Sequence, residues 1–361
     1  MGKLLSIIYP YRNRDLKRIK NSLDSLKNQS VSDFEVFFVD YGSHLEKAQA
    51  AVKLCREYEF VTYQYLPAQF QPWNKSKALN NVIKELKTGF CFVADVDLIF
   101  HPQFVEKALK FQIKNKTVYF QVGFLEPEET SKENDFSSYK NYRLSNHEAT
   151  GLSMFPVNIL KELRGFDEFY HFWGAEDTDI HVRIKNAGYE VDFYDEEVLM
   201  LHQWHPSYRS TESKKLSKEL QLSGIVQMNH QHVKYTVQYK TTKVNRKNWG
   251  ECITLEEFNE LEKAPVNFVL HNEQRKIDHL MFVLMPRCKG KILKITIRKD
   301  PFQNSPKSSV KKLMGKKVPE YYTLKQINDK VLLHIISFYR DKPYTFKIRD
   351  DLKEIEITIK F

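Results

Sequence analysis

The stretch FCFVADVDLIFHP, residues 90–102, is apolar enough for the interior of a parallel sheet, yet it carries two carboxylates. Asp95 and Asp97 are two residues apart, and on an extended chain this spacing directs both side chains to one face. Two like charges so close repel each other unless a cation lies between them or one of them is protonated. The stretch therefore predicts a buried strand that carries a charged site.

Strands and helices alternate around this stretch in the first half of the chain. Further strands are predicted at 4–10, 34–42, 61–66, 117–124, 189–195 and 197–204. Helices are predicted at about 14–29, 44–58 and 76–87, after Pro102, and at 176–188. This alternation predicts an α/β fold, in which a mostly parallel sheet has helices on both faces. Ligands of such sheets bind at the carboxyl ends of the strands.

The pattern changes after residue 240. Short apolar or alternating runs, separated by Pro, Lys and Asn, predict strands at 267–272, 279–286, 291–300, 331–340 and 354–361. We therefore expect two domains, a catalytic domain at 1–240 and a smaller, β-rich and basic accessory domain at 241–361. Residues 125–150 are polar and aperiodic, which favours a long surface excursion beside the site.

Composition excludes several classes of protein. The four cysteines are far apart in the 361-residue sequence and form no CxxC pair or Cys/His cluster, so neither a disulfide framework nor a zinc site is expected. No stretch approaches the length of a membrane span, and we expect a cytoplasmic location. The net charge of +10 favours an anionic partner such as a nucleotide or a membrane surface. No zinc finger, RNP motif or basic helix indicates a nucleic-acid partner.

Charged residues follow the first two strands. Arg12 and Arg14 in YPYRNR lie between a strand and a helix, where guanidinium groups and a helix N-terminus can hold a phosphate. Asp40 in FVDYGS lies at the end of the second strand. Solvated charges and helix caps explain these positions equally well, so neither motif decides the function alone.

The two carboxylates of DVD suit a divalent cation that also contacts a diphosphate, because Mg²⁺ and Mn²⁺ prefer hard oxygen ligands. Glu176 and Asp177 begin a predicted helix beside Trp173, where an aromatic face can stack on a sugar and a carboxylate can act as a general base. The alternative is an acidic first turn that stabilises the helix dipole. The histidines of MLHQWHP, at positions 202 and 205, are plausible metal ligands.

Together these residues resemble the family 2 glycosyltransferases of the GT-A fold, in particular those related to β-1,4-galactosyltransferases and bacterial chondroitin-type polymerases. The resemblance covers about residues 4–206. It rests on the order and spacing of YPYRNR, VDYGS, NKSKALN, DVDLIF, GFDEFYHFWGAEDTD and the LH at 201–202.

The resemblance implies a role for each matching residue. The residues implied to contact the nucleotide of a UDP-sugar donor are Pro10, Tyr11, Arg12, Arg14, Asp40, Lys77 and Asp95. Those implied to hold Mn²⁺ (or Mg²⁺) are Asp95, Asp97 and His202, whose position fits better than that of His205. Those implied to form the acceptor pocket are Trp173, Gly174 and Glu176, and those implied to be catalytic are Asp177, as the base, and Glu176.

The implied function is metal-dependent transfer of a sugar to a hydroxyl of a glycan acceptor or lipid-linked oligosaccharide, with inversion, in bacterial-type surface polysaccharide or glycan synthesis. Residues 205–220 are expected to act as a lid over the donor. Tyr11 and Ala175 depart from the phenylalanine and glycine that the galactosyltransferase relatives often have, so the sugar could be Gal, GalNAc, GlcNAc, Glc or GlcA. A metal-dependent nucleotidyltransferase and a retaining glycosyltransferase stay open, as does peripheral contact with the inner membrane surface.

Overall fold

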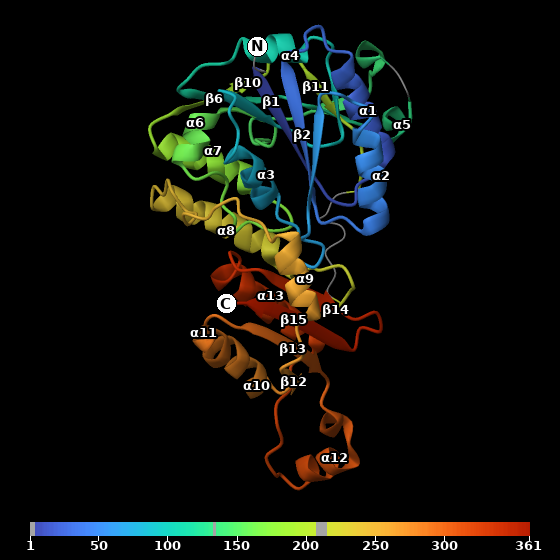
Figure 1. Cartoon of the computed structure of the whole chain (residues 1–361), viewed down its shortest axis with the longest axis vertical. Coiled ribbons are helices and arrows are strands. Elements are labelled where there is room, and N and C mark those ends of the chain that lie inside the picture. The colour runs from blue at the N-terminus through green and yellow to red at the C-terminus, as the bar shows by residue number, and fades with distance from the viewer. Residues whose placement is uncertain (1–3, 133–134, 207–214) are drawn as a thin grey trace. The chain divides into compact units, whose positions relative to one another are not determined.

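The computed structural model describes residues 4–132, 135–206 and 215–361, which form two compact units (Figure 1). The described parts of the first unit are 4–66, 73–132, 135–206 and 226–251. Those of the second are 67–72, 215–225 and 252–361. The two units thus interleave along the chain, and the expected division after residue 240 stays a prediction about which segments fold independently.

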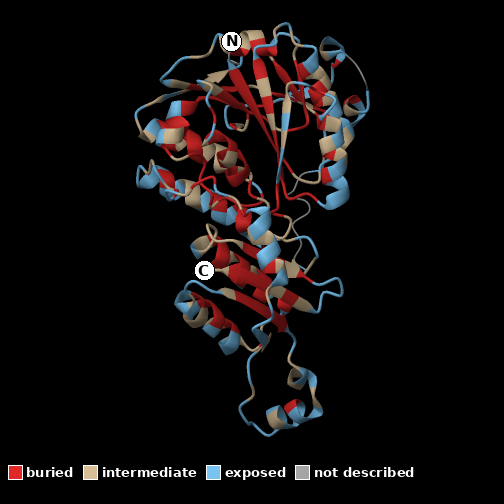
Figure 2. Cartoon of the chain, viewed as in Figure 1, coloured by how far each residue is buried: buried red, intermediate tan, exposed pale blue. Residues whose placement is uncertain are grey.

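The first unit is built around a seven-stranded sheet. In spatial order its strands are β10 (Glu190–Tyr194), β6 (Lys116–Phe120), β9 (Ser153–Pro156), β4 (Phe90–Val93), β1 (Leu5–Tyr11), β2 (Phe34–Tyr41) and β3 (Val61–Leu66). Only β9 runs antiparallel to its neighbours, while β1 is parallel to β2 and β4. The prediction of a mostly parallel sheet is therefore confirmed, and Figure 2 shows its central strands largely buried.

Helices accompany these strands as the alternation predicted. They are α1 (Leu16–Lys27), α2 (Leu45–Cys55), α3 (Lys75–Ile83), α4 (Phe104–Leu109), α5 (Pro127–Thr130), α6 (Val157–Glu162), α7 (Glu176–Asn186) and α8 (Ile225–Gln238), with a 3-10 turn at Phe136–Ser138. Figure 1 shows α1 and α2 on one side of the sheet and α3, α6 and α7 on the other.

Helix α1 shows why the sequence pattern is reliable here. Its residues Ile19, Leu23 and Leu26 recur at helical spacing and are buried. The side chain of Asp15 accepts a hydrogen bond from the backbone N–H of Lys17 and so caps the helix.

The DVD stretch is the main local departure. A continuous strand through Asp95 and Asp97 is wrong, because β4 ends at Val93 and β5 (Leu98–Phe100) begins a different sheet. That second sheet has the order β5, β11 (Met200–His202), β7 (Gly123–Leu125) and β8 (Tyr142–Leu144). The chain turns between the sheets where the two carboxylates lie, so their side chains are not forced onto one face.

The second unit contains a four-stranded sheet of β12 (Phe268–His271), β13 (Ile292–Arg298), β15 (Glu354–Lys360) and β14 (Tyr344–Ile348). Its helices are α9 (Leu255–Lys263), α10 (Gln274–His279), a π-helix at Leu280–Leu284, α11 (Met285–Arg287), a 3-10 turn at Pro301–Asn304, α12 (Pro306–Leu313) and α13 (Leu324–Phe338). An additional C-terminal sheet is thus confirmed.

Two of the strands predicted in this unit are wrong. Residues 279–286 continue the helix that begins at α10, and 331–340 fall almost wholly within α13. Thr323 and Gln326 form a capping box that starts α13, and its buried residues recur at helical spacing. A short apolar run is compatible with either a buried helix or a strand, which is why the prediction failed here.

Within the described ranges, no helix combines the length and the apolar character needed to cross a lipid bilayer.

Candidate active site

The residues predicted to contact the nucleotide lie at one edge of the central sheet. Tyr11, the last residue of β1, is directly opposite Asp40 in the parallel register of β1 and β2. Arg12 and Arg14 follow in the loop after β1, and Asp95 follows the end of the adjacent β4. The carboxyl ends of these parallel strands therefore bring the predicted residues together at the edge where such sheets bind ligands.

Asp40 is fully buried at this edge. One of its oxygens accepts from the backbone N–H of Ser43 at 2.8 Å, and the other accepts from the Tyr63 hydroxyl at 2.8 Å. Burial raises the pKa of Asp40, although these hydrogen bonds and the charge of Arg12 act in the opposite direction. Asp40 thus braces the loop after β2, and its contact with a uracil or ribose stays a prediction.

Asn13 joins the loops after β1 and β2, a role that the sequence analysis missed. Its backbone N–H donates to the Ser43 hydroxyl at 2.8 Å, and its side-chain oxygen accepts from the backbone N–H of His44 at 2.9 Å. Its φ of 55° is left-handed, a conformation that Asn tolerates better than most residues. An Asn directly after a strand and between two arginines was the available signal.

Lys75, at the start of α3, is the cation that the sequence analysis did not find. Its Nζ lies 3.1 Å from Oδ1 of Asp95 and 3.7 Å from Oε1 of Glu176. Burial opposes the charged form of Lys75, but the two carboxylates outweigh it and raise the Lys75 pKa. Removal from water likewise opposes the ionised form of Asp95, but Lys75, His202 and Arg14 together outweigh it, so the pKa of Asp95 is lowered.

Lys77, the lysine singled out from the sequence, lies two residues after Lys75 in α3 and is buried. Its backbone N–H donates to the side chain of Asn74, which caps the helix. A contact between Lys77 and the nucleotide stays a prediction. The motif NKSKALN carried both lysines, and nothing local distinguished the one whose side chain reaches the carboxylates.

Glu176 and Asp177 begin α7, and Glu176 lies beside Lys75. Burial, together with the neighbouring charge of Asp177, raises the pKa of Glu176 to about 7, while Lys75 acts in the opposite direction. Asp177 lies close to the chain at Gly151, where an added Cβ would be 3.3 Å from Oδ2 of Asp177. Two adjacent carboxyl groups thus have different surroundings, and only Glu176 contacts Lys75.

Asp97 lies on the other side of the turn, against two histidines. Its oxygens are 3.4 Å from Nε2 of His202 and 3.4 Å from Nε2 of His205. The antiparallel pairing of β5 with β11 places His202 opposite Leu98, and the backbone N–H of Gln203 donates to the Asp97 carbonyl at 3.0 Å. Strand pairing therefore brings together residues more than 100 positions apart in the sequence.

The donor set of this cluster fits a divalent transition metal. The ligand atoms of Asp97, His202 and His205 all lie within 4.8 Å of one another, and one carboxylate with two imidazoles is a donor set that divalent transition metals bind. Burial lowers the pKa of His205 against the opposing charge of Asp97, which favours the neutral ring that a metal requires. The structure brings His205 into the cluster, whereas Asp95 contacts Lys75.

The segment before α7 is held in a strained conformation. Phe172, Gly174 and Ala175 have φ values of 66°, 95° and 72°, and only glycine adopts this region without cost. The Phe172 N–H donates to the Trp73 carbonyl at 2.8 Å, and the Asn229 side chain donates to the carbonyls of residues 171 and 173 at 3.1 Å each. The exposed Trp173 is thereby presented next to the carboxyl groups of α7.

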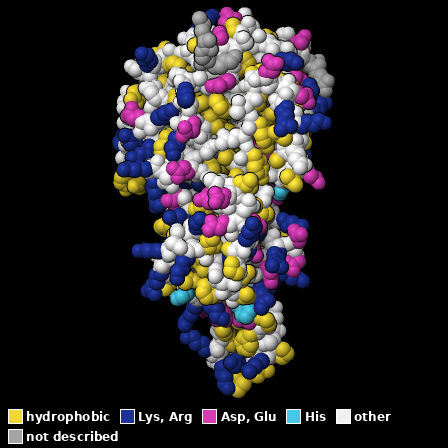
Figure 3. Space-filling model, in the orientation of Figure 1, with side chains coloured by type: hydrophobic (Ala, Val, Ile, Leu, Met, Phe, Trp, Pro, Cys, Tyr) yellow, Lys and Arg dark blue, Asp and Glu magenta, His cyan; other side chains and the backbone are white. Residues whose placement is uncertain are grey.

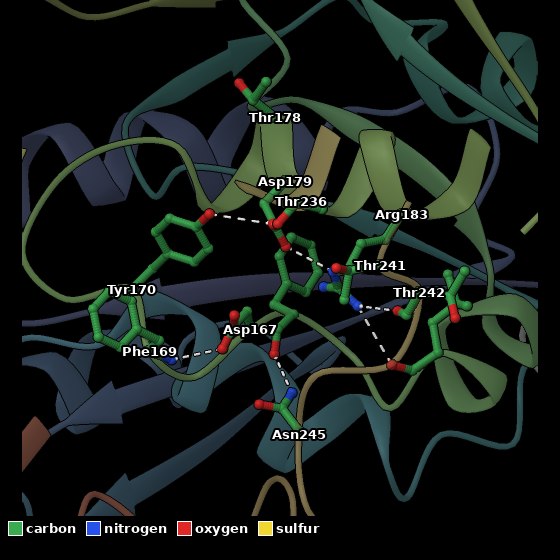
Figure 4. Close-up of polar contacts among 12 residues, drawn as sticks. Asp167, Phe169, Tyr170, Thr178, Asp179, Arg183, Thr236, Thr241, Thr242 and Asn245 are labelled. Atoms are coloured by element: carbon green, nitrogen blue, oxygen red, sulfur yellow. Dashed lines mark hydrogen bonds and ion pairs between the residues drawn. The ribbon is translucent and has the colours of Figure 1, made fainter. Parts of the chain in front are cut away.

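Helix α7 is fixed from behind by a buried ion pair (Figure 4). Arg183 donates to Asp179 at 2.7 Å, and both side chains are wholly inaccessible to solvent. Asp179 also accepts from the hydroxyls of Tyr170 and Thr236, at 3.2 and 2.8 Å. Arg183 further donates to the Gly165 carbonyl at 2.8 Å. Asp179 thus locks α7 to the loop before it and to α8.

The lid predicted at residues 205–220 is described only in part. Within 205–220, residues 207–214 lie outside the described part of the chain. The lid stays a prediction.

Family models match the part of the chain that carries this site. Residues 6–159 match the model of glycosyl transferase family 2, and residues 133–205 match the model described as the N-terminal domain of galactosyltransferase. Residues 6–205 form a glycosyltransferase domain. All the predicted site residues fall within it, and the fold is of the GT-A type that the sequence predicted.

Three solved glycosyltransferases are similar to part of this chain. The mannosyltransferase PcManGT from Pyrobaculum calidifontis, in complex with GDP-Man and Mn²⁺, is 15% identical over 66% of this chain and 72% of its own, with a TM-score of 0.43. TarS of S. aureus is 17% identical over 71% of this chain and 46% of its own, with a TM-score of 0.43. GalNAc-T7 with UDP, GalNAc and Mn²⁺ is 13% identical over 65% and 48%, with a TM-score of 0.46. The chain thus spans less than half the length of the last two.

Proposed function

We propose that this glycosyltransferase domain transfers a sugar from a UDP-sugar to a hydroxyl of a glycan acceptor or lipid-linked oligosaccharide, with the help of a divalent metal and with inversion. The observation that carries the proposal is the Asp97, His202 and His205 cluster, which lies two residues from the Lys75 and Asp95 pair. The short turn from Asp95 to Asp97 thus joins the candidate metal site to Lys75, which also contacts Glu176 of the candidate acid pair.

The donor side of the reaction is assigned to the residues at the sheet edge. The charge of Arg14 acts on both Asp95 and His205, which is consistent with a position from which its guanidinium holds the diphosphate. Arg12, Tyr11 and Pro10 are assigned to the nucleotide. A divalent cation bound by Asp97, His202 and His205 would neutralise charge that develops on the departing diphosphate.

The acceptor side is assigned to the segment that leads into α7. Trp173 offers an aromatic face for the acceptor sugar, and Asp177 takes the proton from its hydroxyl as the hydroxyl attacks the anomeric carbon. Attack from the face opposite the diphosphate inverts that carbon. Glu176 is engaged with Lys75, so we assign it to positioning within the acceptor pocket.

A binding experiment tests the metal-dependent part of the proposal. Thermal unfolding of the full chain is recorded with UDP, with Mn²⁺ and with both, and only the combination is expected to give a large stabilisation. Asp97→Ala should abolish the combined shift, whereas Asp33→Ala, at an exposed loop position, should keep it. Equal shifts for the two variants, or no shift with UDP and Mn²⁺, would contradict the proposal.

A turnover experiment tests the sugar and the stereochemistry. The full chain is incubated with Mn²⁺ and each of UDP-Gal, UDP-GalNAc, UDP-GlcNAc, UDP-Glc and UDP-GlcA, and slow hydrolysis identifies the accepted donor. The anomeric configuration of the product, measured by NMR, then distinguishes inversion from the retaining alternative. The match to glycosyltransferase models favours both of these outcomes over the metal-dependent nucleotidyltransferase. A cytoplasmic role in bacterial-type surface polysaccharide or glycan synthesis belongs to the same proposal.

A further inference from the structure

The segment between β13 and α13 departs from the sheet of the second unit. It contains the 3-10 turn at Pro301–Asn304 and the helix α12. Figure 1 shows α12 set away from the strands of its own unit, at the end of two long connections. The segment therefore adds little to the core of that unit, and its composition needs another explanation.

Helix α12 is amphipathic with its apolar face turned outward. Val310, Leu313 and Met314 share one face at helical spacing and are 54%, 91% and 60% exposed. Ser308 lies on the opposite face and is only 1% exposed. A surface helix of a globular protein normally buries its apolar stripe and exposes its polar side. The reversed arrangement leaves the apolar face of α12 uncovered by the described residues.

Positive charge surrounds this apolar face. Residues 306–317 contain Lys307, Lys311, Lys312, Lys316 and Lys317 and no acidic residue. Within the described ranges none of these lysines forms an ion pair with a carboxylate, although Lys311 lies over the ring of Phe302. Figure 3 shows hydrophobic side chains among Lys and Arg at the end of the molecule where Figure 1 places α12.

The helix is formed without a partner. Ser305 caps it by accepting from the N–H of Ser308 at 3.2 Å, and Gly315 ends it with a φ of 66°. At its base, the Asn272 side chain accepts from the N–H of Asp300 at 2.8 Å and donates to Gln303 at 3.1 Å. The apolar and basic surface is therefore presented on a preformed helix, which lowers the cost of binding.

We propose that α12 and the two lysines that follow it dock the protein on the surface of an anionic phospholipid bilayer. The exposed side chains of Val310, Leu313 and Met314 enter the boundary between headgroups and acyl chains, while the lysines contact lipid phosphates. An anionic bilayer is the partner that offers both an apolar layer and a dense negative charge. Nucleic acid matches the charge but leaves the apolar face uncovered, and a second copy of this basic surface is repelled. This inference goes beyond the proposed function and does not depend on it.

Vesicle flotation of the full chain tests the proposal. Phosphatidylcholine vesicles with added phosphatidylglycerol should bind the protein, phosphatidylcholine alone should not, and salt should weaken the binding. Leu313→Glu is expected to weaken binding at least about tenfold. Leu255→Glu, a matched change at a 64% exposed leucine of α9, should leave it unchanged. The UDP and Mn²⁺ thermal shift, recorded for each variant, confirms folding and reports the active site separately.

A paired charge experiment separates specific docking from net charge. Lys312→Glu with Lys316→Glu is expected to weaken binding at least about tenfold, because each lysine near an anionic surface contributes about fivefold. Lys53→Glu with Lys110→Glu changes the net charge equally at exposed positions of the other unit and should have a small effect. Equal losses in the two pairs would overturn the proposal.

Two further outcomes would name a different partner and overturn it as well. The first is a concentration-dependent dimer in lipid-free ultracentrifugation that Leu313→Glu dissociates. The second is binding of single-stranded RNA that the lysine pair abolishes and Leu313→Glu preserves, without vesicle binding by the unmodified chain. Vesicle binding lost in both α12 variants and kept in both controls supports the docking surface.

Discussion

The two sides of the DVD turn solve the same electrostatic problem in different ways. On one side Asp95 faces Lys75, a permanent cation held 3.1 Å away. On the other side, among the described residues, Asp97 pairs with His202 and His205, each at 3.4 Å, and imidazole, unlike an ammonium group, can itself bind a metal. The charge of Asp95 is balanced within the protein, whereas the Asp97 side has the ligands of a cation. The two carboxylates are therefore expected to respond differently to every perturbation below.

The largest difference is expected when each carboxylate is neutralised. Asp97→Asn should lower kcat/KM about a thousandfold and abolish Mn²⁺ dependence, because a catalytic metal contributes several kcal/mol. Asp95→Asn should mainly weaken donor binding and leave Mn²⁺ affinity, measured by titration calorimetry, within a few-fold of the unmodified protein. Equal loss of Mn²⁺ affinity in the two variants would break the comparison.

The next largest effect concerns the acid pair of α7. Asp177→Asn should lower kcat about a hundredfold or more with little change in KM, since general bases contribute at least that much. Glu176→Gln should affect KM as strongly as kcat, because Glu176 contacts Lys75 on the Asp95 side. Steady-state kinetics with the accepted donor check both. If Glu176→Gln alone removes the base-dependent limb of the pH profile, the roles of the two residues are exchanged.

Glu176 should also make stability depend on pH. Its folded pKa of about 7 lies above the ordinary value of 4.5, so the folded state binds the proton more tightly than the unfolded state. The free energy of unfolding should therefore fall, by about 2 kcal/mol, as the pH rises from about 4.5 to 7. Denaturant unfolding of Glu176→Gln should show this decline much reduced, and an unchanged decline would assign it to other groups.

A smaller effect is expected from removing the cation of the Asp95 side. In Lys75→Met the pKa of Asp95 and that of Glu176 should both rise, because Lys75 lowers both. The acidic limb of the pH–activity profile should move about one unit upward, a tenfold loss on that limb. Lys75→Arg should restore the profile, and Lys20→Met, at an exposed ion pair, should not alter it. If the acidic limb of the Lys75→Met profile does not move, Lys75 does not control the ionisation of these carboxyl groups.

The smallest effect is expected at Ala175, the residue that precedes Glu176. Its φ of 72° costs an alanine about 1 kcal/mol, which glycine avoids. Ala175→Gly should therefore raise the free energy of unfolding by up to about 1 kcal/mol, offset in part by the greater freedom of glycine when unfolded. Thermal denaturation measures this, with Ala187→Gly, at a residue of ordinary φ, as the destabilised control. Destabilisation at both positions would show that the strain at Ala175 is absent.

Local patterns in the sequence predicted the alternating strands and helices of the first unit, because each element there carries its own periodicity. They did not predict the turn at Asp95 and Asp97, where the chain leaves one sheet for another. The partners of those carboxylates come from two distant places, the start of α3 and the region at and just after the end of β11. Contacts between residues so far apart in the sequence depend on how the elements pack, and the sequence indicated only the residue types. The helix over most of residues 331–340 was missed for a different reason, because a short apolar run is compatible with either a strand or a buried helix.

The amide of Asn74 holds two parts of the candidate active site together. Its oxygen accepts from the N–H of Lys77, while its nitrogen donates to the Glu168 carbonyl at 2.9 Å and lies 3.1 Å from the His171 ring. The start of the helix that carries Lys75 and the loop that leads to Trp173 therefore share one support. If the loop that leads to Trp173 were replaced by that of a relative, residue 74 and its neighbours would have to be replaced as well. Otherwise the new loop would lack the hydrogen bonds that hold it in place.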